Sequence, residues 1–197
     1  MAARSTMADL ILMVRQLAVL DETDLTPGVL GYWTDTRIQT ALDQTRQDVD
    51  GLSLSPVKET DSGGTIRYLR YNSGHTYYEQ TDGGTAIFYV YDATGARAGT
   101  ATYTADYRRG VVTFGSDQAG TAYYLSGRVY DPYLAAAEVW EYKAANVADR
   151  FDFTADGASF KVSQLVDHYQ RQASRMKAQS KTGGVMISTF YRDDVVP

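Results

Sequence analysis

The stretch VYDPYLAAAEVW, residues 129–140, marks the point where the chain changes from strand-like to helical sequence. Asp131 followed by Pro132 is typical of a helix start, because an N-cap carboxylate accepts backbone N–H groups and proline fits the first helical turn. The residues that follow keep an apolar face at helical spacing to about Asp149. This face consists of Tyr133, Ala136, Ala137, Trp140, Ala144 and Val147.

Upstream of this switch, residues 52–130 alternate apolar and polar side chains between turns rich in Gly and Asp. The alternation is typical of antiparallel strands joined by tight turns. Strands are expected at residues 65–71, 85–91, 100–103, 110–114 and 122–130. The segment therefore predicts a small antiparallel β-domain.

Three more helices are expected around this domain. The Thr6-Met7-Ala8-Asp9 stretch has the spacing of a capping box, which predicts a helix with apolar residues from Leu10 to Leu20. A second helix is expected from Thr34 or Asp35 to about Val49, and a last one from Lys161 or Ser163 to Ser180.

The predicted fold class is α+β, a small helical bundle with an inserted antiparallel β-domain and an extended C-terminal arm. The boundaries are residues 1–51 for the N-terminal helices, 52–130 for the β-domain, 131–181 for the C-terminal helices and 182–197 for the arm. A tight turn at Asp156-Gly157 is expected between the last two helices.

Composition excludes several classes of function. The chain of 197 residues is 44% hydrophobic and 22% charged, which is ordinary for a globular protein. It has no cysteine, which excludes disulfides and thiolate metal sites. No apolar run is long enough to span a membrane, and we expect no signal peptide in residues 1–7. A formal net charge of −5 gives no nucleic-acid footprint.

Four groups of polar residues invite a catalytic or metal-binding interpretation, and each has a simpler one. They are His75 with Glu79, Glu138 with Glu141, the cluster Asp21, Glu22 and Asp24, and Ser73-Gly74-His75. His75 and Glu79 are expected between strands, and Glu138 and Glu141 on a solvated helix face. The acidic cluster is expected at a helix end, and Ser73 has no identifiable acid to orient a catalytic histidine. We therefore expect no enzyme, no metal ion and no cofactor.

The tyrosines, most of which lie in the β-domain, have three interpretations. Tyrosine is enriched at protein interfaces, which makes Tyr89, Tyr91, Tyr123 and Trp140 candidates for contacts between copies of the chain. The alternative function is a carbohydrate- or receptor-binding module, in which Tyr77, Tyr78 and Tyr123 are the residues to test. A plain hydrophobic core is the third interpretation.

The C-terminal arm combines a hinge with an apolar segment. Gly183 and Gly184 separate it from the last helix. Its candidate docking residues are Val185, Met186, Ile187, Phe190 and Tyr191. Such a segment adds a strand to a partner, or else folds back as an edge strand of its own β-domain.

Two stretches resemble a known family. Residues 103–114 (YTADYRRGVVTF) resemble hairpins common in structural proteins of tailed phages. Residues 130–140, with Lys143-Ala144-Ala145 and 151–160 after them, look like the C-terminal half of head-tail connector (adaptor) proteins of long-tailed phages and gene transfer agents. The resemblance covers about half of the chain, and the predicted β-domain is larger than the hairpin of the smallest family members.

The resemblance implies a structural protein of the virion, assembled in the host cytoplasm, that forms a twelve-fold ring beneath the portal. Its implied partners are the portal protein, the stopper or another tail-proximal protein, and further copies of itself, with no membrane involved. Basic residues gather near the C-terminal end of the last helix, where the helix dipole favours cations. The alternative interpretation of these residues is a weak contact with DNA in the lumen of the ring.

Overall fold

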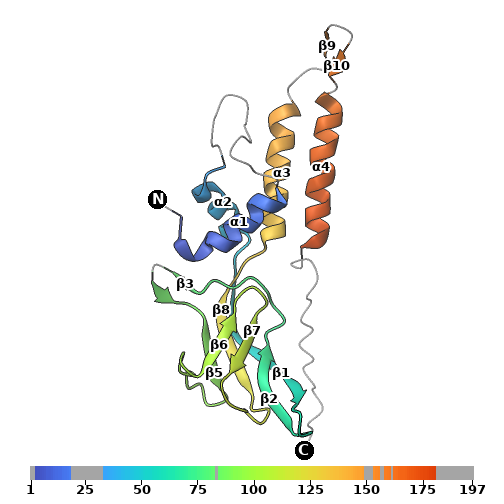
Figure 1. Ribbon diagram of the computed structural model, residues 1–197. Helices are drawn as coiled ribbons and strands as arrows, with labels where there is room; N and C mark the ends of the chain where they lie inside the picture. The colour runs from blue at the N-terminus through green and yellow to red at the C-terminus, as the bar shows by residue number, and fades with distance from the viewer. Residues whose placement is uncertain are drawn as a thin grey trace, which may run out of the picture.

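The computed structural model has a helical bundle at one end and a curled antiparallel sheet at the other (Figure 1). It describes residues 3–18, 33–82, 84–148, 153–155, 158–160 and 162–180. The fold is α+β, which confirms the predicted class. The C-terminal arm, its two glycines and the acidic cluster Asp21, Glu22 and Asp24 lie outside the described residues.

The bundle is built around one central helix. Its helices are η1 (Ser5–Met7), α1 (Ala8–Leu17), α2 (Asp35–Gln44), α3 (Pro132–Ala148) and α4 (Val162–Gln179). α1 and α2 pack on one side of α3, and α4 runs along the other side (Figure 1). Asp131 caps α3 as predicted, because its Oδ1 accepts the N–H groups of Tyr133 and Leu134, each at 3.0 Å.

The β-domain is a six-stranded sheet in which every neighbouring pair is antiparallel, in the order β5-β8-β1-β2-β7-β6. Its strands are β1 (Gln47–Thr60), β2 (Ile66–Asn72), β5 (Tyr89–Asp92), β6 (Tyr103–Asp106), β7 (Val111–Phe114) and β8 (Tyr123–Val129). Two separate hairpins join β3 (Thr81–Asp82) to β4 (Thr85–Ala86) and β9 (Phe153–Ala155) to β10 (Ala158–Phe160).

β1 holds the two halves of this sheet together. Its first half pairs with β8 and its second half with β2, and the register shifts between Val49 and Leu52. Gly51 lies within this irregularity at φ +62°, a conformation that glycine adopts without steric cost. The 14-residue strand can therefore bend and serve both halves.

Residues 77–79 connect the two sides of the curled sheet next to the bundle. The N–H groups of Tyr77 and Tyr78 donate to the carbonyls of Arg108 and Tyr107, at 3.1 and 2.8 Å. On the other side, the Glu79 N–H donates to the Arg128 carbonyl at 3.0 Å. This short segment therefore fixes the position of Glu79 between the sheet and the helices.

Two separate hydrophobic cores result, one in each part of the chain. The helical core includes Met7, Val14, Ile38, Leu42, Val139 and Trp140. The core of the β-domain includes Leu54, Tyr71, Tyr78, Phe88, Val112 and Leu125. Two separate cores mean that the position of the sheet relative to the helices depends on the contacts at their junction.

Two details of the predicted helices are wrong. Thr6 does not cap α1: its hydroxyl instead donates to Glu79 Oε1 and to the Thr81 carbonyl, at 3.2 and 2.9 Å. The second helix ends at Gln44 rather than near Val49, because residues 47–49 pair with β8 and begin β1. Pairing with a distant strand outweighs the local helical pattern there.

The hairpin β9–β10 lies in the connection between α3 and α4, which themselves run side by side (Figure 1). Within the hairpin, Ala155 pairs with Ala158. The turn predicted at Asp156-Gly157 falls on residues that the structure does not describe. Within the described ranges, none of the helices combines the length and the apolar character that crossing a bilayer requires.

Candidate functional site

The entry to the β-domain, the exit from it and the end of α4 meet at one residue, Asp131. The Asp131 N–H donates to Thr45 Oγ1 at 3.0 Å, which ties the start of α3 to the end of α2. The Ser180 hydroxyl donates to Asp131 Oδ2 at 2.6 Å. The β-domain is thus an insertion between two helices whose ends remain together, and Ser180, the last described residue, lies at this junction.

A network of charged and polar side chains lies between the bundle and the sheet. Its centre is Glu79, which is 0% exposed. Glu79 Oε1 accepts from Arg4 Nε at 2.9 Å, and Glu79 Oε2 accepts from the Tyr130 hydroxyl at 2.5 Å. Arg128 approaches the same carboxylate at 3.9 Å. We call Glu79, Arg4, Thr6, Tyr130 and Arg128 the junction network.

Further carboxylates neutralise the two arginines of the junction network. Arg4 pairs with Asp43 of α2, and Arg128 pairs with Asp82, each at 2.5 Å. The hydrogen bond from Arg128 lowers the pKa of Asp82 below its ordinary value. Burial, and then the hydrogen bond to Glu79, raises the pKa of Tyr130 far above its ordinary value. The Glu79 carboxylate is therefore a connection between the two parts, since its partners already occupy both oxygens.

A groove of about 430 Å³ lies next to the junction network, between α1 and the sheet. Leu12 and Met13 of α1 form one wall, and Tyr77 and Tyr107 form the other. Asp9 and Arg108 lie on opposite walls, and Leu12 is 54% exposed. We call this feature, defined by these six residues, the α1 groove.

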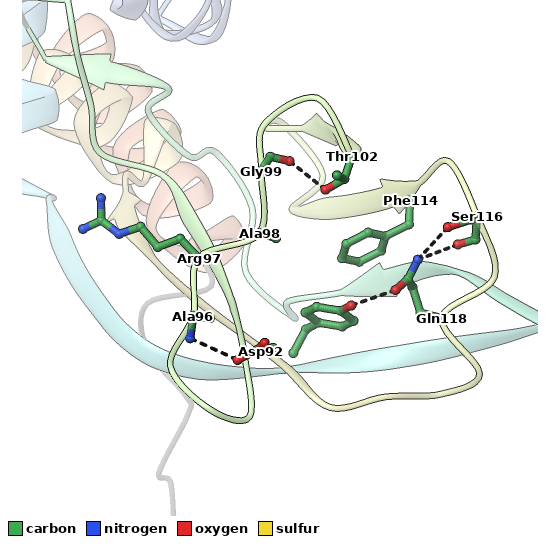
Figure 2. A pocket seen from close by; sticks show the side chains of 10 residues that line it. Asp92, Ala96, Arg97, Ala98, Gly99, Thr102, Phe114, Ser116 and Gln118 are labelled. Atoms are coloured by element: carbon green, nitrogen blue, oxygen red, sulfur yellow. Dashed lines mark hydrogen bonds between the residues drawn. The ribbon is translucent and has the colours of Figure 1, made fainter.

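A second hollow of about 310 Å³ lies in the β-domain, lined by the segments before β6 and after β7 (Figure 2). The rings of Phe114 and Tyr123 lie 4.5 Å apart, but Phe114 is only 4% exposed. Gln118 accepts from the Tyr123 hydroxyl at 2.7 Å and donates to the Ser116 carbonyl at 2.8 Å. Little aromatic surface is thus open for stacking a sugar, and these polar groups bond to one another.

The three tyrosines of the carbohydrate alternative do not form one exposed platform. Tyr78 is 4% exposed in the core of the β-domain, and Tyr123 packs against the same core. Tyr77 packs instead against Tyr133 of α3, with ring centroids 6.5 Å apart. Tyr77 also has φ +65°, a strained conformation for a residue with a side chain.

The four residues predicted for contacts between copies lie in three different environments. Trp140 is 5% exposed in the helical core, where its indole N–H donates to the Leu17 carbonyl at 3.2 Å. Tyr123 is half-buried, packs against the core of the β-domain and lines the second hollow. Tyr89 and Tyr91 are half-buried on the edge strand β5, and the Arg97 guanidinium lies 3.9 Å from the centre of the Tyr89 ring. These two tyrosines are thus the members of the set that lie on an edge strand of the six-stranded sheet.

Of the four polar groups weighed as catalytic or metal-binding sites, three lie within the described residues. Glu79 is enclosed in the junction network, and the carbonyl rather than the ring of His75 accepts from Ser73. Burial, and then the charge of Glu141, raises the pKa of Glu138, while Glu141 itself pairs with Lys177 at 2.6 Å. The described part of the chain contains no group of three or more potential metal ligands.

The junction network is the feature that sequence reasoning missed. Glu79 attracts attention only through its spacing from His75, and Arg4 lies far from it in the sequence. A carboxylate directly after the aromatic pair Tyr77-Tyr78 is the one local signal of a buried charge. Comparisons of the chain with protein-family models, with curated proteins and with solved structures found no match.

Proposed function

We propose that the chain is a structural adaptor of a tailed-phage particle, which forms a homo-oligomeric ring beneath the portal and links the DNA-filled head to the stopper and tail. The observation that carries the proposal is the exposed face of α4. This 18-residue helix has apolar residues on one face, yet only Ala173 and Met176 are buried among its described side chains. Leu165 on the same face is 40% exposed.

The packing of the bundle explains why this face is incompletely covered. α3 receives α1 and α2 on one side and α4 on the other, so α4 packs mainly against α3 (Figure 1). An amphipathic helix is stabilised by burial of its apolar face. A neighbouring copy in a ring completes that burial, and Tyr89 and Tyr91 on the edge strand β5 offer a second contact surface.

The arrangement of the bundle around the inserted β-domain is the second observation that supports the proposal. The bundle stays continuous where the β-domain is inserted, because Thr45 and Asp131 remain in contact. The arm, residues 182–197, departs from the same junction through Ser180. In this proposal Gly183 and Gly184 allow residues 185–191 to dock on the portal, and the β-domain faces the capsid or the tail.

A ring-assembly experiment with the portal protein tests the proposal. The purified chain is mixed with the portal, and electron microscopy counts portal particles that carry an added ring. Leu165→Asp places a charge on the exposed apolar face of α4 and is expected to reduce ring formation at least tenfold, as loss of a buried leucine contact predicts. Ser174→Asp, at an exposed position on the opposite face of α4, is the matched control.

Three outcomes separate the parts of this proposal. Rings from wild type and the Ser174→Asp variant, but not from the Leu165→Asp variant with an unchanged circular dichroism spectrum, support the α4 contact. Equal rings from all three refute that contact and leave the adaptor role standing. No ring and no portal binding by the wild-type chain refutes the adaptor role itself.

A further inference from the structure

The α1 groove combines exposed apolar surface with separated charges. Leu12, at 54%, is more exposed than any other large hydrophobic residue in the described ranges. Within those ranges no carboxylate forms an ion pair with Arg108, which lies across the groove from Asp9. A volume of about 430 Å³ falls within the usual range of ligand pockets, roughly 300 to 1,000 Å³. A suitable occupant has several apolar side chains next to charges of both signs.

The C-terminal arm has this composition. Five apolar residues within 185–191 are followed directly by Arg192, Asp193 and Asp194. Apolar anchors match the walls of the α1 groove, while the acidic pair complements Arg108 and Arg192 complements Asp9. The chain thus contains a segment whose order of apolar and charged residues suits the groove.

The arm also starts close enough to reach the groove of its own chain. Ser180 is bonded to Asp131 at 2.6 Å, and Tyr133, in the first turn of α3, packs against Tyr77 of the groove. Four residues separate Ser180 from Val185, and the five Cα-to-Cα steps span about 17 Å when extended. So short a connection gives the arm an effective concentration of about millimolar at its own groove.

Residues 19–32 are the other segment outside the structure that begins near α1, but their two ends are held elsewhere. Ala18 accepts from Lys143 at 2.9 Å, and Trp33 accepts from Arg15 at 2.9 Å and packs against Tyr142. Both ends therefore lie against the distal half of α3. The α1 groove lies instead where α1 faces Tyr77 and Tyr107 of the β-domain.

We propose that residues 185–191 of the C-terminal arm bind in the α1 groove of the same chain before assembly. The inference concerns the isolated chain and does not depend on the adaptor role, so either proposal can fail without the other.

Disulfide trapping in the full-length chain tests the proposal, because the natural sequence has no cysteine to interfere. Leu12→Cys is combined in turn with Ile187→Cys and with Phe190→Cys, and the oxidised chains are separated on a non-reducing gel. We expect at least one pair to form an intramolecular disulfide at a protein concentration low enough to suppress dimers. Leu12 is exposed, so its replacement leaves the helical core intact.

Leu165→Cys combined with the same arm cysteines is the matched control. Leu165 is also an exposed leucine, and it lies 15 residues before Ser180 on α4, about 22 Å along the helix. The arm is long enough to reach both positions. A difference in disulfide yield therefore measures which position the arm prefers and not whether the arm can reach it. The expected disulfide yield is at least tenfold higher with Leu12→Cys, the factor that burial of one apolar anchor provides. Equal yields, or disulfides only between chains, overturn the proposal, and the second result identifies the arm of another copy as the occupant.

A charge exchange provides a second, independent test. Arg108→Asp is expected to speed hydrogen exchange of residues 185–191 several-fold, and added Asp193→Arg and Asp194→Arg substitutions are expected to restore slow exchange. Arg109→Asp is the control, because this neighbour is 81% exposed and lies at 3.8 Å from Asp106. Equal exchange in wild type and the Arg108→Asp variant contradicts the predicted pairing.

Discussion

Removing the Glu79 carboxylate is expected to weaken the connection between the bundle and the β-domain. Glu79→Ala leaves Arg4 Nε and the Tyr130 hydroxyl without the acceptor that each has at 2.9 and 2.5 Å. Breaking a fully buried ion pair costs roughly 3–5 kcal/mol. Arg4 and Arg128 are 23% and 22% exposed and keep Asp43 and Asp82, so water and these partners compensate part of the loss. We therefore expect a loss of about 3 kcal/mol in the free energy of unfolding.

The two tryptophans allow this loss to be assigned to one part of the chain. Trp33 and Trp140 both belong to the helical bundle, so tryptophan fluorescence follows the bundle alone. Far-ultraviolet circular dichroism follows helices and strands together. In urea, the wild-type chain is expected to give coincident transitions with the two probes. The Glu79→Ala chain is expected to unfold at lower urea, with the two transitions separated.

The matched control is Glu141→Ala, which removes an exposed carboxylate paired with Lys177 at 2.6 Å. Exposed ion pairs contribute about 0–1 kcal/mol, so its transition is expected to stay close to that of the wild type. If Glu79→Ala shifts the transition no further than Glu141→Ala, the junction network does not hold the two parts together.

Three further predictions concern the fold. Gly110→Ala is expected to destabilise the chain by at least about 3 kcal/mol in urea unfolding, because a Cβ at φ +65° would lie 2.0 Å from the His75 carbonyl oxygen. Gly120→Ala, at φ +74° but with no neighbour closer than 3.7 Å, is expected to cost only about 1–2 kcal/mol. Asp131→Ala removes the cap of α3 and is expected to lower stability by about 1–2 kcal/mol in the same assay, whereas an unchanged midpoint would contradict the capping role. Burial raises the pKa of Tyr78 and of Tyr130, so the folded state favours the protonated phenols. This stability is complete below the unfolded tyrosine pKa of about 10 and is lost as pH rises above it, so thermal unfolding midpoints should fall there, and a midpoint unchanged from pH 9 to pH 11 would contradict the prediction.

Local signals predicted much of this architecture. The Asp131-Pro132 helix start is confirmed because capping depends on adjacent residues, whose N–H groups Asp131 accepts. β7 and β8 lie within one residue of their expected bounds, since alternation and turn residues are also local. β1, residues 47–60, was missed over its whole length, because much of its strand character comes from pairing with β8, which lies far away in the sequence. The strand predicted at residues 100–103 is wrong except at Tyr103, where β6 begins.

The candidate surfaces were harder to predict for the same physical reason. Tyr78 and Tyr89 are chemically alike in the sequence, yet one is buried beside Phe88 and the other lies on an edge strand. The junction network joins Arg4 to Glu79, and the α1 groove joins Leu12 to Tyr107. No periodic pattern in the sequence indicates either arrangement, because each forms only when the sheet is positioned next to the bundle.

The proposal that most needs testing is that the chain links the head of a phage particle to its tail. If the proposal is right, a tailed phage or prophage carries the gene, and the test is to delete that gene and count, by electron microscopy, heads that retain DNA and heads that carry tails. We expect heads that have lost their packaged DNA, together with tails that are not attached to heads. Both defects are expected to be reversed when the chain is supplied in trans. Tailed, DNA-filled particles in normal number without the chain would contradict it.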